Sequence, residues 1–175
     1  MRALLSTRLF AARRLEAAPL GLAREAGFPD LELCASGRHF DPFELGEVQR
    51  ASACMQRAGV RARWLHIGDA VLNQLGDERR LLAFLEAVRG LQIEVVCADT
   101  HAWGVRQDVG LMRLDDLKIR LQASGARLVL DLRRIDERIV RRLPSDLGLC
   151  WDMAGATAYD GEAAVREVRE MFEGL

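Results

Sequence analysis

Short apolar runs alternate with amphipathic stretches along the whole chain. Residues 31–35, 62–67 and 93–98 are apolar runs typical of strands that are buried on both faces. Each run is followed by a stretch in which apolar residues recur at helical spacing. This alternation is the pattern of βαβ units, whose parallel strands are joined by crossover helices. We therefore expect an α/β fold with a parallel sheet.

The alternation repeats about six times, and no Pro/Ser-rich linker or charge block divides the chain. We expect one domain over residues 1–175. The predicted strands are 3–9, 31–35, 62–67, 93–98, 128–130 and 147–151. The predicted helices include 44–58, one capped by Asp77, 111–123, 136–143 and 161–172.

An aspartate closes each of the last two predicted strands. Asp131 follows strand 128–130, and Asp152 follows strand 147–151. The carboxyl ends of parallel strands meet at one edge of the sheet, which is where α/β proteins bind their ligands. The sequence thus predicts a site at that edge.

Composition limits the classes of partner and cofactor. The formal net charge of −1 gives no general attraction to nucleic acid or to an anionic membrane, and no apolar run is long enough to span a bilayer. The four cysteines form no C-x-x-C pair, which favours a reduced, cytoplasmic protein. Neither G-x-G-x-x-G nor G-K-[ST] occurs, so we expect no nucleotide cofactor.

Four segments resemble the xylose isomerase-like TIM barrels, a superfamily of sugar isomerases, sugar-phosphate epimerases and type IV apurinic endonucleases. The segments are AREAGFPDLEL at 23–33, ACMQRAGVRARWLHIG at 53–68, ASGARLVLDL at 123–132 and LGLCWDMAGA at 147–156. In that family the first of these strands carries a glutamate, and the other three end in a histidine, a metal-binding glutamate and a metal-binding aspartate. The matching positions here are Glu32, His66, Asp131 and Asp152.

The resemblance implies a divalent metal, Mn, Mg or Zn, held by Asp131 and Asp152. It also implies that Glu32 and His66 act on a sugar-like ligand, because carboxylates and imidazoles move protons in such reactions. His101 follows another predicted strand at the same edge and is a further candidate for this role. The chain departs from the family in three ways. Six strands are found where a closed barrel has eight, Asp131 replaces the glutamate, and Gly155 stands where the family usually has histidine.

Each of these residues also has an ordinary structural interpretation. The two aspartates could cap helices or pair with Arg133 and Arg134. The histidines could be hydrogen-bonded parts of the fold, and Glu32 could form a buried salt bridge. His39 lies in a polar loop, where we expect it to be solvated.

Two functions follow from these alternatives. The first is metal-assisted isomerisation or epimerisation of a sugar or sugar phosphate. The alternative is a non-catalytic, degenerate barrel that binds a small molecule or a protein partner. The polar groups at the strand ends favour the enzyme, and the missing ligands favour the alternative.

A six-unit sheet leaves a parallel edge that needs a partner or a cover. We expect either a second copy of the chain, giving a homodimer, or the terminal segments to close this open or narrow barrel. Size-exclusion chromatography with light scattering at several concentrations tests the first arrangement. A strict monomer at all concentrations would remove it.

Overall fold

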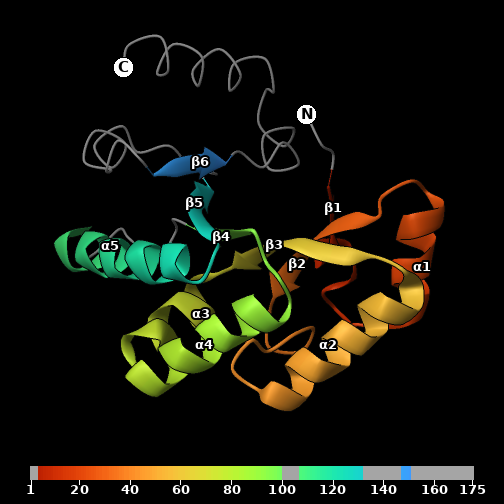
Figure 1. The fold of residues 1–175 in the computed structure, drawn as a ribbon, viewed down its shortest axis with the longest axis horizontal. Helices are drawn as coiled ribbons and strands as arrows, with labels where there is room; N and C mark the ends of the chain where they lie inside the picture. Colours follow the sequence, from red (N-terminus) through yellow and green to blue (C-terminus); the bar gives the residue numbers. More distant parts are fainter. Residues whose placement is uncertain (1–3, 100–106, 132–146, 151–175) are drawn as a thin grey trace, which may run out of the picture.

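The computed structural model describes residues 4–99, 107–131 and 147–150. Within these ranges six strands form one parallel sheet in which each strand lies beside its predecessor in the sequence (Figure 1). The strands are β1 Leu5–Ser6, β2 Asp30–Ala35, β3 Arg61–Ile67, β4 Val95–Asp99, β5 Arg127–Asp131 and β6 Gly148–Cys150. Consecutive parallel strands joined by helices are the arrangement of a TIM barrel. The predicted α/β fold is therefore confirmed, as a partial barrel.

Helices cover the outer side of the curved sheet (Figure 1). They are α1 Ala17–Glu25, α2 Leu45–Ala58, α3 Asp69–Leu72, α4 Glu78–Gly90 and α5 Gln107–Ala123, with 3₁₀ turns η1 Thr7–Phe10 and η2 Asn73–Gly76. The predicted cap of α4 is confirmed, since Asp77 Oδ1 accepts from the Arg80 N–H at 3.0 Å. The predicted helices 136–143 and 161–172 lie outside the described residues. Among those described, no helix has the length and apolar character needed to cross a bilayer.

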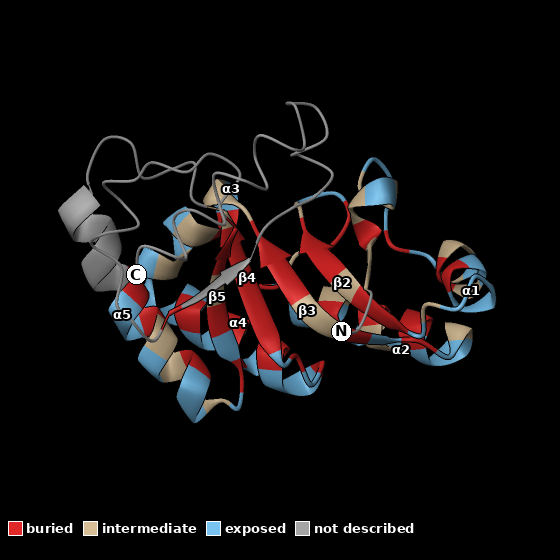
Figure 2. Cartoon of the chain, turned by 90° about the horizontal axis from the view of Figure 1, so that it is seen from above, coloured by how far each residue is buried: buried red, intermediate tan, exposed pale blue. Residues whose placement is uncertain are grey.

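The outer face of the sheet is aliphatic and packs against the helices. Because side chains alternate along a strand, every second residue of β2 to β5 faces this layer. These buried residues are Leu31, Leu33, Ala35, Ala62, Leu65, Ile67, Val96, Ala98, Leu128 and Leu130. Figure 2 shows how continuously β2, β3 and β4 are buried. The intervening residues occupy the inner face, and many of them are polar.

An irregularity in β3 decides which of its residues face inward. Leu31 pairs with Ala62, but the next residue, Glu32, pairs with Trp64, so Arg63 is an extra residue in β3. The alternation of side chains is therefore shifted by one position after Arg63. Arg63 itself forms ion pairs with Asp30 and Glu94. Ala62 and Leu65 consequently both pack on the outer core, and His66 faces the inner side.

The first strand is shorter than the sequence predicts. A strand over 3–9 is wrong beyond Ser6, because the chain turns into η1 at Thr7. The Ser6 hydroxyl accepts from the backbone N–H of Arg8 at 3.3 Å and caps this turn. The turn places Arg8 beside β2 and β3 rather than further along an extended strand.

His39 is buried, so the expectation that it is solvated is wrong. Its exposed fraction is 0%. Nδ1 lies 2.7 Å from the Arg13 carbonyl oxygen, and Nε2 lies 3.0 Å from Thr7 Oγ1. A carbonyl only accepts, so Nδ1 carries a proton and Nε2 of the neutral ring accepts from Thr7. Thr7 Oγ1 in turn accepts from the Cys34 N–H at 2.9 Å. The network fixes η1 against β2.

A second set of polar contacts holds the segment after η1 on helix α2. Glu47 accepts hydrogen bonds from Arg50 and Arg14, which lower the pKa of its carboxyl to about 2. Arg50 also donates to the Leu15 carbonyl at 2.5 Å. The segment that carries Arg13 and Arg14 is therefore anchored at both ends, by His39 and by α2.

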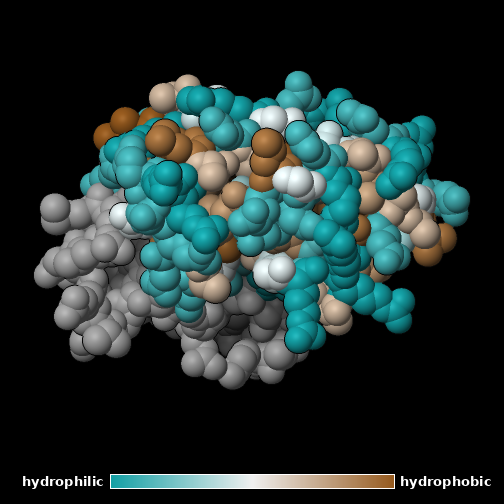
Figure 3. All heavy atoms as spheres, turned by 90° about the horizontal axis from the view of Figure 1, so that it is seen from below, coloured by the Kyte–Doolittle hydropathy of each residue, from teal (hydrophilic) through white to brown (hydrophobic). Residues whose placement is uncertain are grey.

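The exposed apolar side chains within the described ranges are distributed over different elements. The large ones are Leu9, Leu22, Leu45, Leu82 and Ile119, which belong to η1, α1, α2, α4 and α5 respectively. On the face shown in Figure 3, small apolar patches are separated by hydrophilic side chains. Isolated apolar residues of this kind are normal for a protein surface.

Replacement of Thr7 by valine should destabilise the fold by about 2 kcal/mol, because it leaves the Cys34 N–H and the His39 ring without their hydroxyl partner in a buried site. Thr7→Ser keeps the hydroxyl and serves as the control. Urea unfolding of both variants measures the difference. Equal midpoints for the valine and serine variants would contradict the assigned network.

Candidate metal and substrate site

The strand register gathers polar side chains into rows on the inner face of the sheet. Cys34, His66 and Cys97 are successive partners across β2, β3 and β4. Asp99 and Asp131 pair one pleat further toward the carboxyl ends of β4 and β5. Side chains on paired positions of adjacent strands are roughly 5 Å apart, so these groups converge at the edge where a ligand site was predicted.

His66, Cys97 and Asp131 form a compact set of potential metal ligands. One ligand atom from each lies within 4.8 Å of the others. Their exposed fractions are 3%, 1% and 1%, so all three are removed from bulk water. The sheet therefore brings together two of the residues that the sequence singled out, His66 and Asp131. Cys97 joins them as a third.

Asp99 extends the cluster toward the same histidine. Its Oδ2 lies 3.2 Å from His66 Nε2, and the Asp99 side chain is 17% exposed. Since Asp99 is also the register partner of Asp131, two carboxylates stand side by side at the strand ends. Like charges at this separation repel each other unless a cation lies close by.

Arg8 supplies such a positive charge. Its Nη2 lies 2.5 Å from His66 Nε2. Burial alone would lower the pKa of Arg8, but the neighbouring Cys34, Asp99 and Glu32 outweigh this effect and raise it above its usual value. Arg8 is therefore a permanent cation within the polar inner face. It reaches the site from η1, although β1 ends at Ser6.

The contact with Arg8 determines how His66 is protonated. A guanidinium has only donors, so Nε2 must accept the hydrogen bond and the ring carries its proton on Nδ1. While Nε2 accepts from Arg8, it cannot donate to Asp99 Oδ2. The 3.2 Å approach of that carboxylate reflects its attraction to Arg8, which raises the pKa of the guanidinium.

Glu32 lies next to this cluster and nearer the middle of the sheet. Its Oε1 accepts a hydrogen bond from Ser6 Oγ at 2.5 Å, and the side chain is half-buried. Trp64, also half-buried, is its register partner on β3. Glu32 thus combines a fixed orientation with partial access to solvent.

Cys34 is a buried thiol close to Arg8. Burial raises the pKa of its thiol, while the charge and hydrogen bond of Arg8 partly offset that rise. The net direction is upward, so the neutral thiol is favoured. Cys34 and Cys97 are both buried and free of disulfides.

Several members of this cluster were not identified from the sequence. Ser6, Arg8 and Cys97 lie outside the four segments that carry the resemblance. The alternation of a strand offered one usable signal: Cys97 lies two residues before Asp99 and must share its face. Of the predicted site residues, His101 and Asp152 lie outside the described residues.

The donor set determines which metals suit the site. An imidazole, a thiol and a carboxylate match Zn²⁺ or Co²⁺ better than Mg²⁺, which prefers oxygen ligands alone. Donor atoms around a tetrahedral zinc ion lie roughly 3.5 Å apart. The three ligand atoms lie within 4.8 Å of one another, so they would move closer together around an ion. The types of donor present therefore fit a zinc-like ion.

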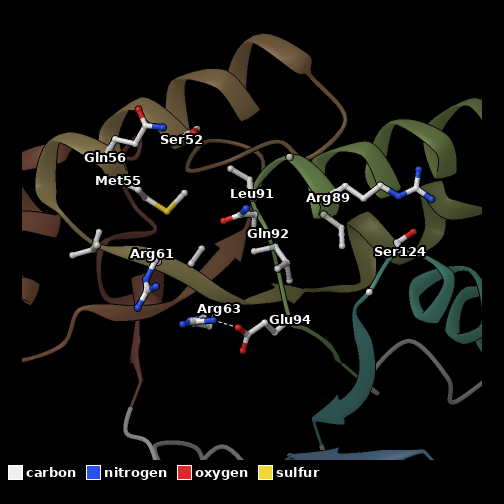
Figure 4. Close-up of a pocket in the computed structure, with 16 residues that line it drawn as sticks. Ser52, Met55, Gln56, Arg61, Arg63, Arg89, Leu91, Gln92, Glu94 and Ser124 are labelled. Atoms are coloured by element: carbon white, nitrogen blue, oxygen red, sulfur yellow. Dashed lines mark ion pairs between the residues drawn. The ribbon is translucent and has the colours of Figure 1, made fainter.

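A cavity lies at the opposite end of β3. It has a volume of about 720 Å³ and is lined by residues of α2, β3, α4 and the loops that precede β4 and β5 (Figure 4). Arg63 and Glu94 form an ion pair at its floor. The amino-terminal edge of a βα barrel generally serves stability rather than chemistry. We therefore place the candidate site at the carboxyl edge, where the possible ligands converge, rather than at this cavity.

Comparison with known proteins gives the fold a family context. No protein-family model and no curated protein matches the chain. A putative xylose isomerase from Rhodospirillum rubrum superimposes with a TM-score of 0.63 at 12% identity, over 89% of this chain and 67% of that one. D-psicose 3-epimerase from Clostridium cellulolyticum, solved with D-tagatose, gives 0.59 at 13% identity, over 91% and 66%.

A third structure is a xylose isomerase-like TIM barrel protein from Mycobacterium smegmatis in complex with magnesium. It superimposes with a TM-score of 0.55 at 12% identity, over 78% of this chain and 55% of that one. The chain therefore has the fold of the xylose isomerase-like barrels, as the sequence motifs suggested. It spans between 55% and 67% of the length of these three structures.

Proposed function

We propose that the cluster at the carboxyl edge binds a divalent metal ion and catalyses isomerisation or epimerisation of a sugar or sugar phosphate. The observation that carries this proposal is the convergence of His66, Cys97 and Asp131 within 4.8 Å on the inner face of the sheet. Neighbours in fold include D-psicose 3-epimerase and a putative xylose isomerase, which supports a sugar-like ligand.

His66, Cys97 and Asp131 are the residues that would hold the metal. The thiol favours zinc or cobalt, although the neighbour from Mycobacterium smegmatis was solved with magnesium. Asp152 remains a proposed further ligand because of the sequence resemblance. A bound ion of this kind supplies a Lewis acid that polarises a substrate carbonyl.

The residues of the chain provide proton transfer and positioning. Glu32 is the candidate base that removes a proton from the carbon beside the carbonyl, because its carboxylate is oriented by Ser6 and is partly accessible. The ring of Trp64, paired with Glu32 across the strands, offers an apolar wall for a sugar. His101 remains a second proposed proton-transfer group from the sequence.

One observation favours the alternative of a non-catalytic barrel that binds a small molecule or a protein partner. Arg8 already occupies His66 Nε2, a nitrogen that could otherwise bind a metal. A site in which this contact is permanent would keep the scaffold and its polar inner face without a metal. The following two experiments separate the alternatives.

Titration with Co²⁺ should reveal one site per chain, with an absorption band from a cobalt–thiolate bond. Cys97→Ala should abolish the band, and Cys97→Ala, His66→Ala or Asp131→Ala should each weaken binding roughly tenfold or more, as loss of ligand-sphere groups does. Cys54→Ala removes another buried thiol, from α2, and is the matched control. Equal affinities in all variants would defeat the metal site, as would a lack of Co²⁺ binding that persists when the contact of Arg8 with His66 is removed by mutation.

The metal-loaded protein should interconvert a ketose and its isomer or epimer in D₂O. NMR should then show deuterium entering at the carbon beside the carbonyl. Glu32→Gln should reduce the rate of interconversion and the rate of deuterium incorporation by roughly 100-fold, the usual contribution of a general base. Glu86→Gln, on the exposed side of α4, should leave both rates unchanged. The panel includes D-tagatose and phosphorylated ketoses. If a protein that binds Co²⁺ converts none of them, the non-catalytic alternative is supported.

A further inference from the structure

Arg8 is held in the site by its preceding neighbours Ser6 and Thr7 and, on its other side, by the Ala11 N–H, which donates to the Arg8 carbonyl at 3.1 Å. Ser6 caps the turn through the Arg8 N–H, and Thr7 is 2% exposed and bonded to His39 and Cys34. The Arg8 side chain then reaches His66 on β3. An exposed arginine on a free loop would sample many positions, but this one leaves a backbone that is fixed on either side.

The hydrogen bond between Arg8 and His66 uses the electron pair that a metal would need. A neutral imidazole has one nitrogen with a lone pair, and the guanidinium, which has no acceptor, must donate to it. With the ring proton on Nδ1, the only lone pair available to a metal is on Nε2. The guanidinium and a metal ion therefore cannot bind His66 Nε2 at the same time.

The surrounding charges lead to the same conclusion. Glu32, Cys34 and Asp99 are the neighbours that raise the pKa of Arg8, and Asp99 is the register partner of Asp131. A divalent ion at His66, Cys97 and Asp131 would be attracted by the same carboxylates and repelled by the guanidinium. Arg8 thus offsets part of the negative charge of the acidic groups that would also favour a metal.

We propose that Arg8 is a built-in competitor of the metal: the guanidinium and a divalent ion are alternative partners of His66 Nε2, and Arg8 sets the metal affinity of the site. The inference rests on the proposed metal site. It adds that metal binding displaces Arg8 from His66, and that the protein without metal keeps its histidine oriented and the charge of its acidic groups partly offset.

Replacement of Arg8 by methionine removes the competing charge and the donor while keeping an unbranched side chain. The Arg8→Met variant should bind Co²⁺ at least tenfold more tightly than the wild type, with the same cobalt–thiolate band. Arg8→Lys should lie between the two, because it keeps the charge but not the planar fork. Arg13→Met is the matched control, since Arg13 lies in the same segment with an exposed side chain, and its affinity should equal that of the wild type.

A measurement on the wild type alone avoids dependence on how the variants fold. The ¹⁵N spectrum of the histidine rings should show His66 Nε2 as an unprotonated, hydrogen-bonded nitrogen without metal. Addition of Zn²⁺ should shift the Nε2 resonance and the Arg8 guanidinium resonance together. A shift at His66 with no change at Arg8 would overturn the competition.

The two proposals fail in different ways. If Cys97→Ala loses Co²⁺ but Arg8→Met binds it no more tightly than the wild type, the metal site stands and the competition is overturned. If neither the wild type nor Arg8→Met binds Co²⁺ through Cys97, both are overturned. Tighter binding in Arg8→Met that disappears on addition of Cys97→Ala supports both.

Discussion

The alternation of side chains across a twisted parallel sheet is the constraint on which the molecule depends. The outer face is packed with aliphatic side chains against helices, which is the main favourable contribution to folding. Every remaining strand residue must then point inward, where Cys34, His66, Cys97, Asp99 and Asp131 lie. The hydrophobic requirement of one face thereby collects reactive groups on the other. The extra residue Arg63 shifts the alternation of side chains in β3, so that Leu65 packs on the outer core while His66 faces inward.

The short turn η1, which follows β1, determines where Arg8 lies in the candidate site. The Ser6 cap and the hydrogen bonds of Thr7 fix η1 against β2. His39 joins this turn to the segment that follows it, through Thr7 and the Arg13 carbonyl. The result is a rigid support for Arg8 at one side of the cluster. Removal of the Arg8 side chain would alter the charge of the site without disturbing the aliphatic core.

Sequence reasoning could predict the features that depend on local pattern. The strands at 31–35, 62–67 and 128–130 each lie within one residue of the observed bounds at either end, and Asp77 caps α4 as expected. The residues it missed depend on pairing between distant segments. The burial of His39 requires Thr7, and the approach of Arg8 to His66 requires the turn after Ser6, neither of which leaves a periodic signal. Cys97 gains a possible ligand role only from its neighbours across the sheet.

The strictly sequential order of the strands has a consequence for biosynthesis. Each strand pairs with the one made just before it, so the nascent chain can extend the sheet without waiting for a distant segment. Arg8 meets His66 when β3 is added, and the set of His66, Cys97 and Asp131 is complete once β5 has left the ribosome. Arg8 can thus be in place before the acidic end of β5 arrives, so that a positive charge already faces the inner side when the last of these carboxylates is added.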